Sequence, residues 1–479
     1  MSNIIKTICC VISTVFLLPN VANSFTLSDI PDIKNKRDIT LVAERGFWTE
    51  HLRKEMIPKF TAHTGVAVKI VDMSLGEMYE GQLDSLRDGL GHYDLISIEA
   101  GWAKEWAANG YTVPLLEIAR EHDPEGEASM KRFLEPYYPS LLKILSYRGQ
   151  YHSIPYNNYV MGNHYRADLF EHEDERKNFK KRYGYDLVPP EGIRQLLDVS
   201  EFFTRKSGQR LAGKILDAPF YGLALMSGLK PHINDEFSAM LWGLGGAWFR
   251  PNYSPAGELL SYQVEANSKI VHKVANTYIE LLKYAHPADK DWAFLESANA
   301  LAEGHVAMWP FAYNNLWPVS AKLEQNIPGS KIGVSEVPLQ HPYVGAYSVS
   351  VSYDSRNPEA SYWLLKYIGS LEGQKAYALG GGNPCRTDVV LDPVFSSEEK
   401  RLLSGAFKAS HEANLGWSDG VLQQGHFTST AMGKIYPELM KTTYAIAHKI
   451  ETVDEGLDKL AQKIKKLQIR YGEVTAISQ

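Results

Sequence analysis

The sequence predicts an α/β fold divided into two domains, and two observations carry that prediction. Early in the chain, short apolar runs alternate with stretches that repeat apolar residues at helical spacing, the pattern of a doubly wound parallel sheet. The chain also has 479 residues, more than one ordinary hydrophobic core serves. Hydrophobic residues make up 44% and charged residues 22%, so the chain has the composition of a globular protein.

Residues 1–24 have the three-part pattern of a secretory signal peptide. Lys6 precedes an apolar run over 7–18, and the small residues Ala22 and Ser24 offer a cleavage site. A membrane-spanning helix needs roughly 20 apolar residues, so we favour a cleaved signal over the alternative of an uncleaved anchor. Cleavage leaves Cys385 as the only cysteine and excludes an intramolecular disulfide.

The first strands and helices follow in alternation. Helices are expected from Thr49, a candidate N-cap, to residue 60, and over 75–90 and 102–108; strands are expected over 39–43, 66–71 and 95–98. Parallel sheets bind ligands beyond the carboxyl ends of their strands. That rule makes four residues candidate ligand contacts: Glu44, Trp48, Glu99 and Trp102.

The later elements are marked by local signals. Strands are expected over 306–308 and 347–351, and charged stretches near 171–186 and 206–219 are interpreted as surface insertions. A helix begins at Pro358 with Asn357 as its cap and Gly369 after its end. The last helix, 453–467, has one apolar stripe, which we expect to pack on its own lobe rather than on a coiled-coil partner.

Charge and motifs exclude several functions. The net charge is −6 with no basic stripe, which argues against nucleic-acid binding. The sequence lacks the nucleophile-elbow, zinc-protease and phosphate-loop motifs, and its 15 histidines have no ligand-like spacing, so we predict no cofactor, no metal and no catalysis. The alternative left open is an exported glycoside hydrolase that uses Glu44 and Glu99 as its carboxylate pair.

Five passages together resemble the family-1 extracellular solute-binding proteins of bacterial ABC importers, the family of maltose-binding protein. They are a strand–helix–strand unit, YDLISIEAGWAKEWAANGYTV, a G-x-Y-x-x-P-Y crossover, ALAEGHVAMW, and a segment with the Pro358 helix and Gly373–Gln374. In order they cover 39–71, 93–113, 149–170, 300–309 and 344–389. Each motif is weak alone, and their order makes the resemblance specific.

The resemblance implies a two-lobed periplasmic-binding-protein fold with a ligand cleft between the lobes. The lobes are expected at 25–155 plus 310–365 and at 156–309 plus 366–479. The implied function is to capture a carbohydrate or sugar alcohol in the periplasm by hinge closure, as a monomer, and to deliver it to the permease subunits of an ABC transporter.

A polyhydroxylated ligand needs planar hydrogen-bond partners for its hydroxyls and aromatic faces for its C–H groups. Arg386 is the preferred charged contact, with a structural salt bridge as its alternative, and Gly345 would let the backbone approach the ligand. The remaining candidates lie at the expected crossings, beside a glycine loop or near the end of the chain: Tyr156, Asn157, Asn158, Trp242, Trp248, Trp309, Tyr313, Tyr347 and, more weakly, Trp417 and Asp419.

Overall fold

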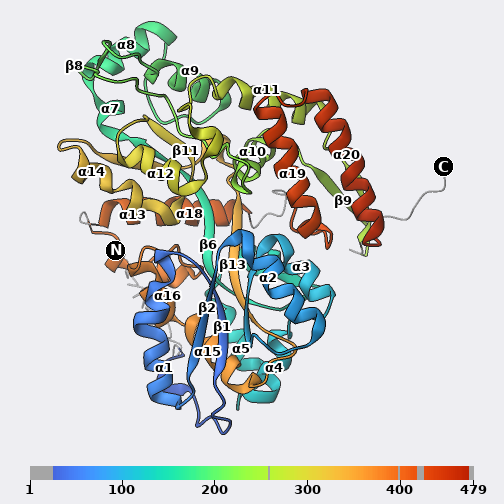
Figure 1. The fold of residues 1–479 in the computed structure, drawn as a ribbon. Helices are drawn as coiled ribbons and strands as arrows, with labels where there is room; N and C mark the ends of the chain where they lie inside the picture. Colours follow the sequence, from blue (N-terminus) through green and yellow to red (C-terminus); the bar gives the residue numbers. More distant parts are fainter. Residues whose placement is uncertain (1–24, 257–258, 398–399, 418–425, 474–479) are drawn as a thin grey trace, which may run out of the picture.

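The computed structural model describes residues 25–256, 259–397, 400–417 and 426–473, so the predicted signal peptide lies outside the described residues. Two groups of helices and strands lie one above the other, and the long strands β6 (Ile154–Arg166) and β13 (Val344–Val351) run between them (Figure 1). The predicted two-lobed α/β fold is confirmed. We call the group that holds the first strands the lower lobe and the other group the upper lobe, as they lie in Figure 1.

One sheet passes through both lobes. Its order is β11-β6-β13-β3-β1-β2, and β12 (Ile332–Ser335) pairs with β6 off this path. The strands β1 (Ile39–Glu44), β2 (Val68–Met73) and β3 (Leu95–Glu99) are parallel, as the sequence predicts. β13 pairs antiparallel with both β3 and β6, so the sheet is mixed rather than purely parallel.

Strand β6 belongs to both halves of the sheet. Residues 154–160 pair with β13, whereas residues 161–166 pair with β11 (Met308–Tyr313) and β12. The pairing with β13 has a register shift between Tyr347 and Ser348. The chain therefore passes from one lobe toward the other inside a continuous strand, while the exact lobe boundaries stay a prediction.

Helices cover the sheet in the lower lobe (Figure 1). They are α1 (Ile57–Thr64), α2 (Leu75–Asp88), α3 (Ala100–Ala108), α4 (Leu115–His122), α5 (Glu127–Leu134), α6 (Pro139–Ile144), α15 (Pro358–Ile368) and α16 (Leu371–Leu379). The predicted start of α15 is confirmed, because the Asn357 side chain accepts a hydrogen bond from the Ala360 N–H at 3.3 Å. The strands β1 and β3 are almost wholly buried, as expected for strands with helices on both faces.

The upper lobe carries most of the remaining helices. They are α7 (Ala167–Glu171), α8 (Glu173–Tyr183), α9 (Ile193–Phe203), α10 (His232–Gly243), α11 (Lys269–Leu281), α12 (Phe294–Ala302), α13 (Trp317–Ser320), α14 (Lys322–Asn326), α18 (Arg401–Trp417), α19 (Met432–Ala447) and α20 (Val453–Arg470). Short elements complete the fold: β9 (Phe249–Tyr253) pairs with β10 (Leu259–Val264), and β7 (Arg210–Leu211) with β8 (Lys214–Ile215). The apolar stripe of α20 is buried and α20 packs on α19, so packing on its own lobe is confirmed.

Two local predictions are wrong. The chain after β1 forms a 3₁₀ turn at Phe47–Thr49 and a π turn at Leu52–Met56 before α1, and the Thr49 hydroxyl donates to the carbonyl oxygens of Glu44 and Gly46 instead of capping a helix. The predicted strand at 306–308 begins at Met308 and continues to Tyr313, because Val306 makes only an isolated bridge with Tyr221.

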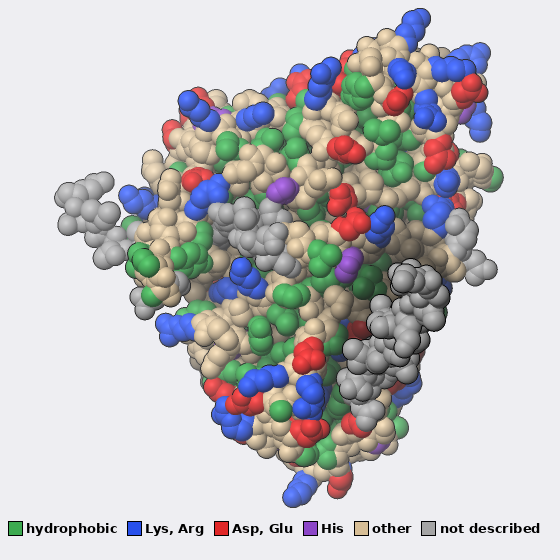
Figure 2. Space-filling model, turned by 180° about the vertical axis from the view of Figure 1, so that it is seen from behind, with side chains coloured by type: hydrophobic (Ala, Val, Ile, Leu, Met, Phe, Trp, Pro, Cys, Tyr) green, Lys and Arg blue, Asp and Glu red, His purple; other side chains and the backbone are tan. Residues whose placement is uncertain are grey.

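The surface carries both signs of charge. Figure 2 shows Lys and Arg side chains interspersed with Asp and Glu over the face opposite to that of Figure 1. In the part of the chain that the structure describes, no helix is both long and apolar enough to cross a bilayer. Cys385 is a free, buried thiol.

Candidate functional site

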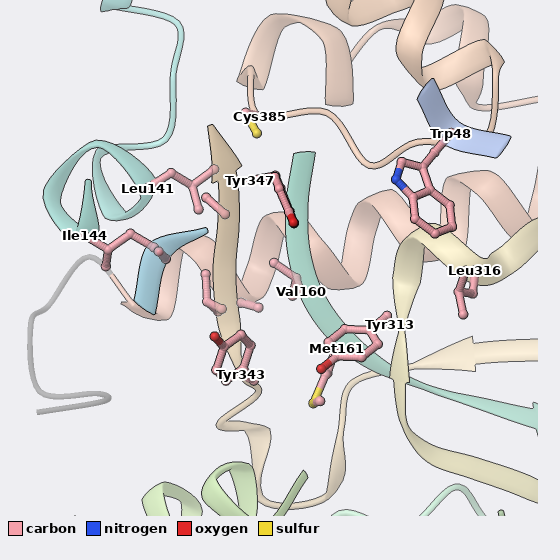
Figure 3. Close-up of a cluster of buried hydrophobic side chains, with 14 of the residues drawn as sticks. Trp48, Leu141, Ile144, Val160, Met161, Tyr313, Leu316, Tyr343, Tyr347 and Cys385 are labelled. Carbon is pink, nitrogen blue, oxygen red and sulfur yellow. The ribbon is translucent and has the colours of Figure 1, made fainter. Parts of the chain in front are cut away.

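A cavity of about 100 Å³ lies between the two lobes. That volume holds several water molecules or one small organic molecule, since a single water needs roughly 10–15 Å³ on the same scale. Figure 3 shows four of the lining side chains, which are Trp48, Tyr313, Leu316 and Tyr343. The lining comprises Glu44, Trp48, Leu75, Glu99, Trp102, Tyr159, Pro231, His232, Asp235, Phe294, Tyr313, Asn315, Leu316, Tyr343 and Tyr436.

Glu44 forms one wall of the cavity at the carboxyl end of β1. Its Oε2 accepts hydrogen bonds from the Trp48 indole N–H at 2.8 Å and from the Tyr159 hydroxyl. Burial raises the pKa of Glu44 to about 7, although both hydrogen bonds favour the ionised form. The short 3₁₀ turn after β1 is what places Trp48 back over Glu44.

Glu99 ends β3 and caps α3. Its Oε2 accepts from the Gly101 N–H at 2.6 Å, and its Oε1 accepts from the Tyr343 hydroxyl at 3.0 Å. Burial, together with the smaller effect of the negative charges of Asp235 and Glu44, raises the pKa of Glu99 to about 8. The carboxyl ends of β1 and β3 therefore present two acids to the same space.

Asp235 comes from the upper lobe, on the first turn of α10. Its two oxygens accept from the hydroxyls of Tyr313 and Tyr436, and burial raises its pKa to about 7. His232 lies three residues earlier on the same helix face, with Nδ1 3.3 Å from the Tyr313 hydroxyl. Burial lowers the pKa of His232 to about 3, so its imidazole is neutral at physiological pH.

Two buried polar groups of the lining have no hydrogen-bond partner among the described residues. They are the Trp102 indole N–H, on α3, and the Asn315 amide oxygen, just after β11. Trp102 is 8% exposed and Asn315 is 3% exposed. A buried polar group without a partner is costly, so each is a ready donor or acceptor for a bound molecule.

Five of the sequence-predicted contacts meet in this cavity. They are Glu44, Trp48, Glu99, Trp102 and Tyr313. Four of them follow the ends of β1 and β3, which is where the rule for parallel strands places a ligand. The fifth ends β11 in the upper lobe, so the predicted set includes both walls.

Three further candidates lie directly behind the lining. Tyr347 packs edge-on against Tyr159 at 5.3 Å between ring centroids, and Trp242 stacks on Tyr343 at 6.1 Å. At Gly345 an added Cβ would lie 2.5 Å from the Tyr343 ring, so this glycine makes room for an aromatic side chain rather than for the ligand itself. These residues support the wall, and a direct ligand contact stays a prediction for them.

The candidates at the crossover lie inside the sheet. Tyr156 packs between Tyr347 and Tyr377, and its neighbours Asn157 and Asn158 are fully buried in β6. The Asn158 backbone N–H donates to the Asn383 carbonyl oxygen at 2.9 Å. None of these three residues is in the cavity lining, so their predicted ligand role has no support from their position.

Three more candidates lie in packed interior regions outside the lining. The Trp248 indole N–H donates to Ser238 Oγ at 2.9 Å, and Trp309 packs edge-on against His164. Arg386 makes a bidentate pair with Asp388, with distances of 3.0 and 2.6 Å, which is the salt bridge weighed as its alternative. The Trp417 side chain and Asp419 lie outside the described residues.

Sequence reasoning missed several lining residues. The polar and aromatic ones are Tyr159, His232, Asp235, Phe294, Asn315, Tyr343 and Tyr436. A usable signal existed for three of them. Tyr159 directly follows the predicted contacts Tyr156, Asn157 and Asn158, and His232 and Asp235 share one helix face at a spacing of three. The other residues have ordinary local contexts.

Fold and cavity define a two-lobed protein with a cavity between its lobes. Residues 48–375 match the family model of the bacterial extracellular solute-binding proteins, and the chain belongs to this family. The resemblance noted in the sequence is thereby confirmed.

Individual relatives are distant. The chain is similar to a probable amino-acid ABC transporter periplasmic-binding protein of Sinorhizobium fredii, with 24% identity over 337 residues, 70% of this chain and 69% of the relative. Among solved structures it is similar to an ABC transporter solute-binding protein of Agrobacterium radiobacter in complex with ribitol, with 19% identity, a TM-score of 0.71 and coverage of 91% and 100%. A maltose-bound protein of T. maritima gives 16% identity, a TM-score of 0.65 and coverage of 90% and 100%.

Proposed function

We propose that this protein is the periplasmic binding component of an ABC importer and captures a carbohydrate or sugar alcohol. The observation that carries the proposal is the cavity between the lobes, to which both lobes contribute polar and aromatic side chains. Structural neighbours of this chain were solved with ribitol and with maltose, which supports the same class of ligand.

The lining has the chemistry that a polyhydroxylated molecule requires. The carboxyl groups of Glu44, Glu99 and Asp235 accept hydrogen bonds from hydroxyls, and the unpaired Trp102 N–H donates one. The rings of Trp48 and Phe294 approach to 6.2 Å between centroids and offer apolar faces to C–H groups. Small-molecule sites combine such apolar walls with a few oriented polar groups.

We propose that the two lobes close on the ligand, because the polar groups of the cavity come from both lobes. Glu44 and Glu99 come from the lower lobe, whereas Asp235 and Asn315 come from the upper lobe. A ligand that contacts both walls has more interactions when the lobes are closed, so it favours the closed form. The segments of β6 and β13 that pair with each other are the natural place for the hinge. We propose that the closed monomer then docks on the permease.

The proposal involves binding without a chemical step. Glu44 and Glu99 both line the cavity, which the glycoside hydrolase alternative requires, but the family is one of binding proteins. Incubation with chromogenic glycosides is expected to give no release of the chromophore. Turnover at these carboxyl groups would favour the hydrolase.

Isothermal titration calorimetry with residues 25–479 tests the ligand class. The panel contains sugar alcohols, mono- and disaccharides and, because the relative from Sinorhizobium fredii is a probable amino-acid binder, the amino acids. We expect a carbohydrate-type ligand to bind and to reduce the radius of gyration in small-angle X-ray scattering. Binding of amino acids alone would contradict the ligand class, and binding without compaction would contradict hinge closure.

A pair of tryptophan variants tests the cavity itself. Trp102→Phe removes the unpaired N–H, and we expect the affinity for the bound ligand to fall about tenfold, the value of roughly one hydrogen bond. Trp106→Phe is the matched control, since Trp106 lies on the same helix, is fully buried and has an unpaired N–H, but is outside the lining. Equal losses of affinity in the two variants would argue against this cavity as the binding site.

A further inference from the structure

The charge of the cavity points to a ligand that carries a positively charged nitrogen, such as an amino sugar or an aminated sugar alcohol. We infer this from the lining, and it rests on the proposed function, which it narrows from neutral polyols to their cationic relatives. The claim concerns Glu44, Glu99 and Asp235 together, which we call the acidic triad.

No positively charged side chain among the described cavity-lining residues balances the charge of the acidic triad. Among the described lining residues there is no lysine or arginine, and the one basic group, His232, is held neutral by burial. Arg386, the arginine expected at the site, is paired with Asp388 elsewhere. All three acids are at most 7% exposed, so solvent does little to screen them.

The hydrogen bonds to the acidic triad come from neutral groups. They are given by the indole of Trp48, the backbone N–H of Gly101 and the hydroxyls of Tyr159, Tyr313, Tyr343 and Tyr436. Such donors orient carboxylates without cancelling their charge, and burying an uncompensated charge is strongly unfavourable. The raised pKa values of the three acids are the response expected to that cost.

Aromatic rings line the space that an ammonium group would occupy. Phe294 lies 6.2 Å from Trp48 and 6.4 Å from Tyr313 between ring centroids, so three rings from both lobes surround one region. The faces of such rings attract cations, most strongly when the cation is removed from water. Carboxyl groups and aromatic faces together are the chemistry of an alkylammonium site.

The protein holds one ammonium group of its own in this manner. Lys366 is 2% exposed, and its Nζ lies 2.7 Å from Asp123 Oδ2. The same nitrogen lies 4.6 Å from the centroid of Phe25 and 5.2 Å from that of Trp363. A carboxylate and aromatic rings therefore suffice to bury an ammonium group in this fold.

The unpaired groups of the lining point to an organic ligand rather than a metal ion. The Asn315 oxygen can accept from an ammonium group, whereas the Trp102 N–H requires an acceptor such as a hydroxyl. No three His, Cys, Asp or Glu side chains in the described ranges are arranged to hold a metal ion. A molecule that carries both an amine and hydroxyls satisfies every group named.

Calorimetry at pH 7.5 with matched neutral and amine ligands tests the inference. The pairs are sorbitol with glucamine, glucose with glucosamine, galactose with galactosamine and mannose with mannosamine, and putrescine is a cation without hydroxyls. We expect the tightest ligand to be an amine whose neutral partner binds at least tenfold more weakly.

The outcomes separate this inference from the proposed function. A neutral partner that binds as tightly as the amine would overturn the inference and leave the carbohydrate class standing. Binding of putrescine without any sugar would support a cationic ligand and contradict the carbohydrate class. An absence of binding across the whole set would contradict both.

Two neighbouring variants on α10 locate the effect. Asp235→Asn keeps the shape and removes one acid of the triad, so we expect the affinity for the amine to fall at least tenfold more than the affinity for its neutral partner. Glu236→Gln is the control, because Glu236 is equally buried but lies outside the lining and accepts from the Met226 N–H and the Tyr278 hydroxyl. An equal loss of amine affinity in both variants would overturn the inference.

Discussion

Each acid of the triad is held by donors from elements far apart in the sequence. Tyr343 reaches Glu99 from the residue before β13, and Tyr436 reaches Asp235 from α19. A tyrosine hydroxyl donates one hydrogen bond, and the ring that carries it is apolar. Each tyrosine therefore orients a carboxyl group and also excludes water from the cavity. At the scale of the residue, the site is therefore a set of acids kept in place by neutral aromatic donors.

Burial of these acids makes the unliganded protein sensitive to pH. Burial raises the pKa of Glu99 to about 8, above the value of roughly 4.3 expected in the unfolded chain. Between these values the folded state binds more protons than the unfolded state, so the free energy of unfolding falls as pH rises. The contribution of Glu99 is complete at low pH and is lost as pH approaches 8.

Glu99→Gln isolates this contribution from other titrating groups. We expect wild type to lose stability relative to the variant by up to about 1.4 kcal/mol per pH unit between pH 5 and 8, with no further change above that range. Urea denaturation of both unliganded proteins at each pH measures the difference. A constant difference across the range would contradict a raised pKa for Glu99.

Elements marked by local signals were predictable from the sequence, and those set by distant pairing were not. The cap at Asn357 and the apolar runs of β1 and β3 depend on adjacent residues, and the structure confirms them. The place of β13 depends on pairing with β3 and β6, far away in the chain. The same division holds for the site: the two acids at strand ends were found, whereas Asp235 on α10 was missed.

The segment at the start of β13 sets the position of a cavity wall. The Tyr343 ring stacks on Trp242, donates to Glu99 and packs over Gly345, where an added Cβ would approach the ring to 2.5 Å. The ring cannot move away without losing its stacking or its hydrogen bond. Gly345 is therefore important because the Tyr343 ring lies so close to it that a side chain at this position of the buried strand would collide with the ring.

Gly345→Ala should displace Tyr343 and weaken ligand binding. We expect a loss of stability of about 1–3 kcal/mol, typical of overpacking, and at least a tenfold weaker affinity. Gly192→Ala is the control, since an added Cβ there meets nothing within 4 Å. Thermal denaturation and calorimetry measure the two effects, and unchanged affinity in Gly345→Ala would show that Tyr343 does not support the site.

At the scale of the whole molecule, the C-terminal helices connect the upper lobe to the lower one. Figure 1 shows α19 and α20 above α2 and α3. Lys434 of α19 lies 3.3 Å from Glu80 of α2, and Tyr471, just after α20, donates to Glu105 of α3 at 3.0 Å. Tyr436 of α19 also lines the cavity. The helix pair therefore holds the lobes together beside the site, a role that its sequence alone could not reveal.

Tyr471→Phe removes one hydrogen bond across the lobes without changing the cavity. The Tyr79 hydroxyl donates to the same Glu105 oxygen from within the lower lobe, so the acid keeps one donor and the fold is preserved. Because the lost bond forms only when the lobes are closed, its energy of about 0.5–1.5 kcal/mol is subtracted from closure and hence from binding. We expect a ligand affinity that is about three- to tenfold weaker and a larger radius of gyration without ligand.

The control variant is Tyr185→Phe. It removes a similar hydrogen bond, to Asp198 at 2.8 Å within the upper lobe, and should lower only the stability of the protein. Equal affinities in the two variants would mean that the C-terminal contact does not contribute to closure.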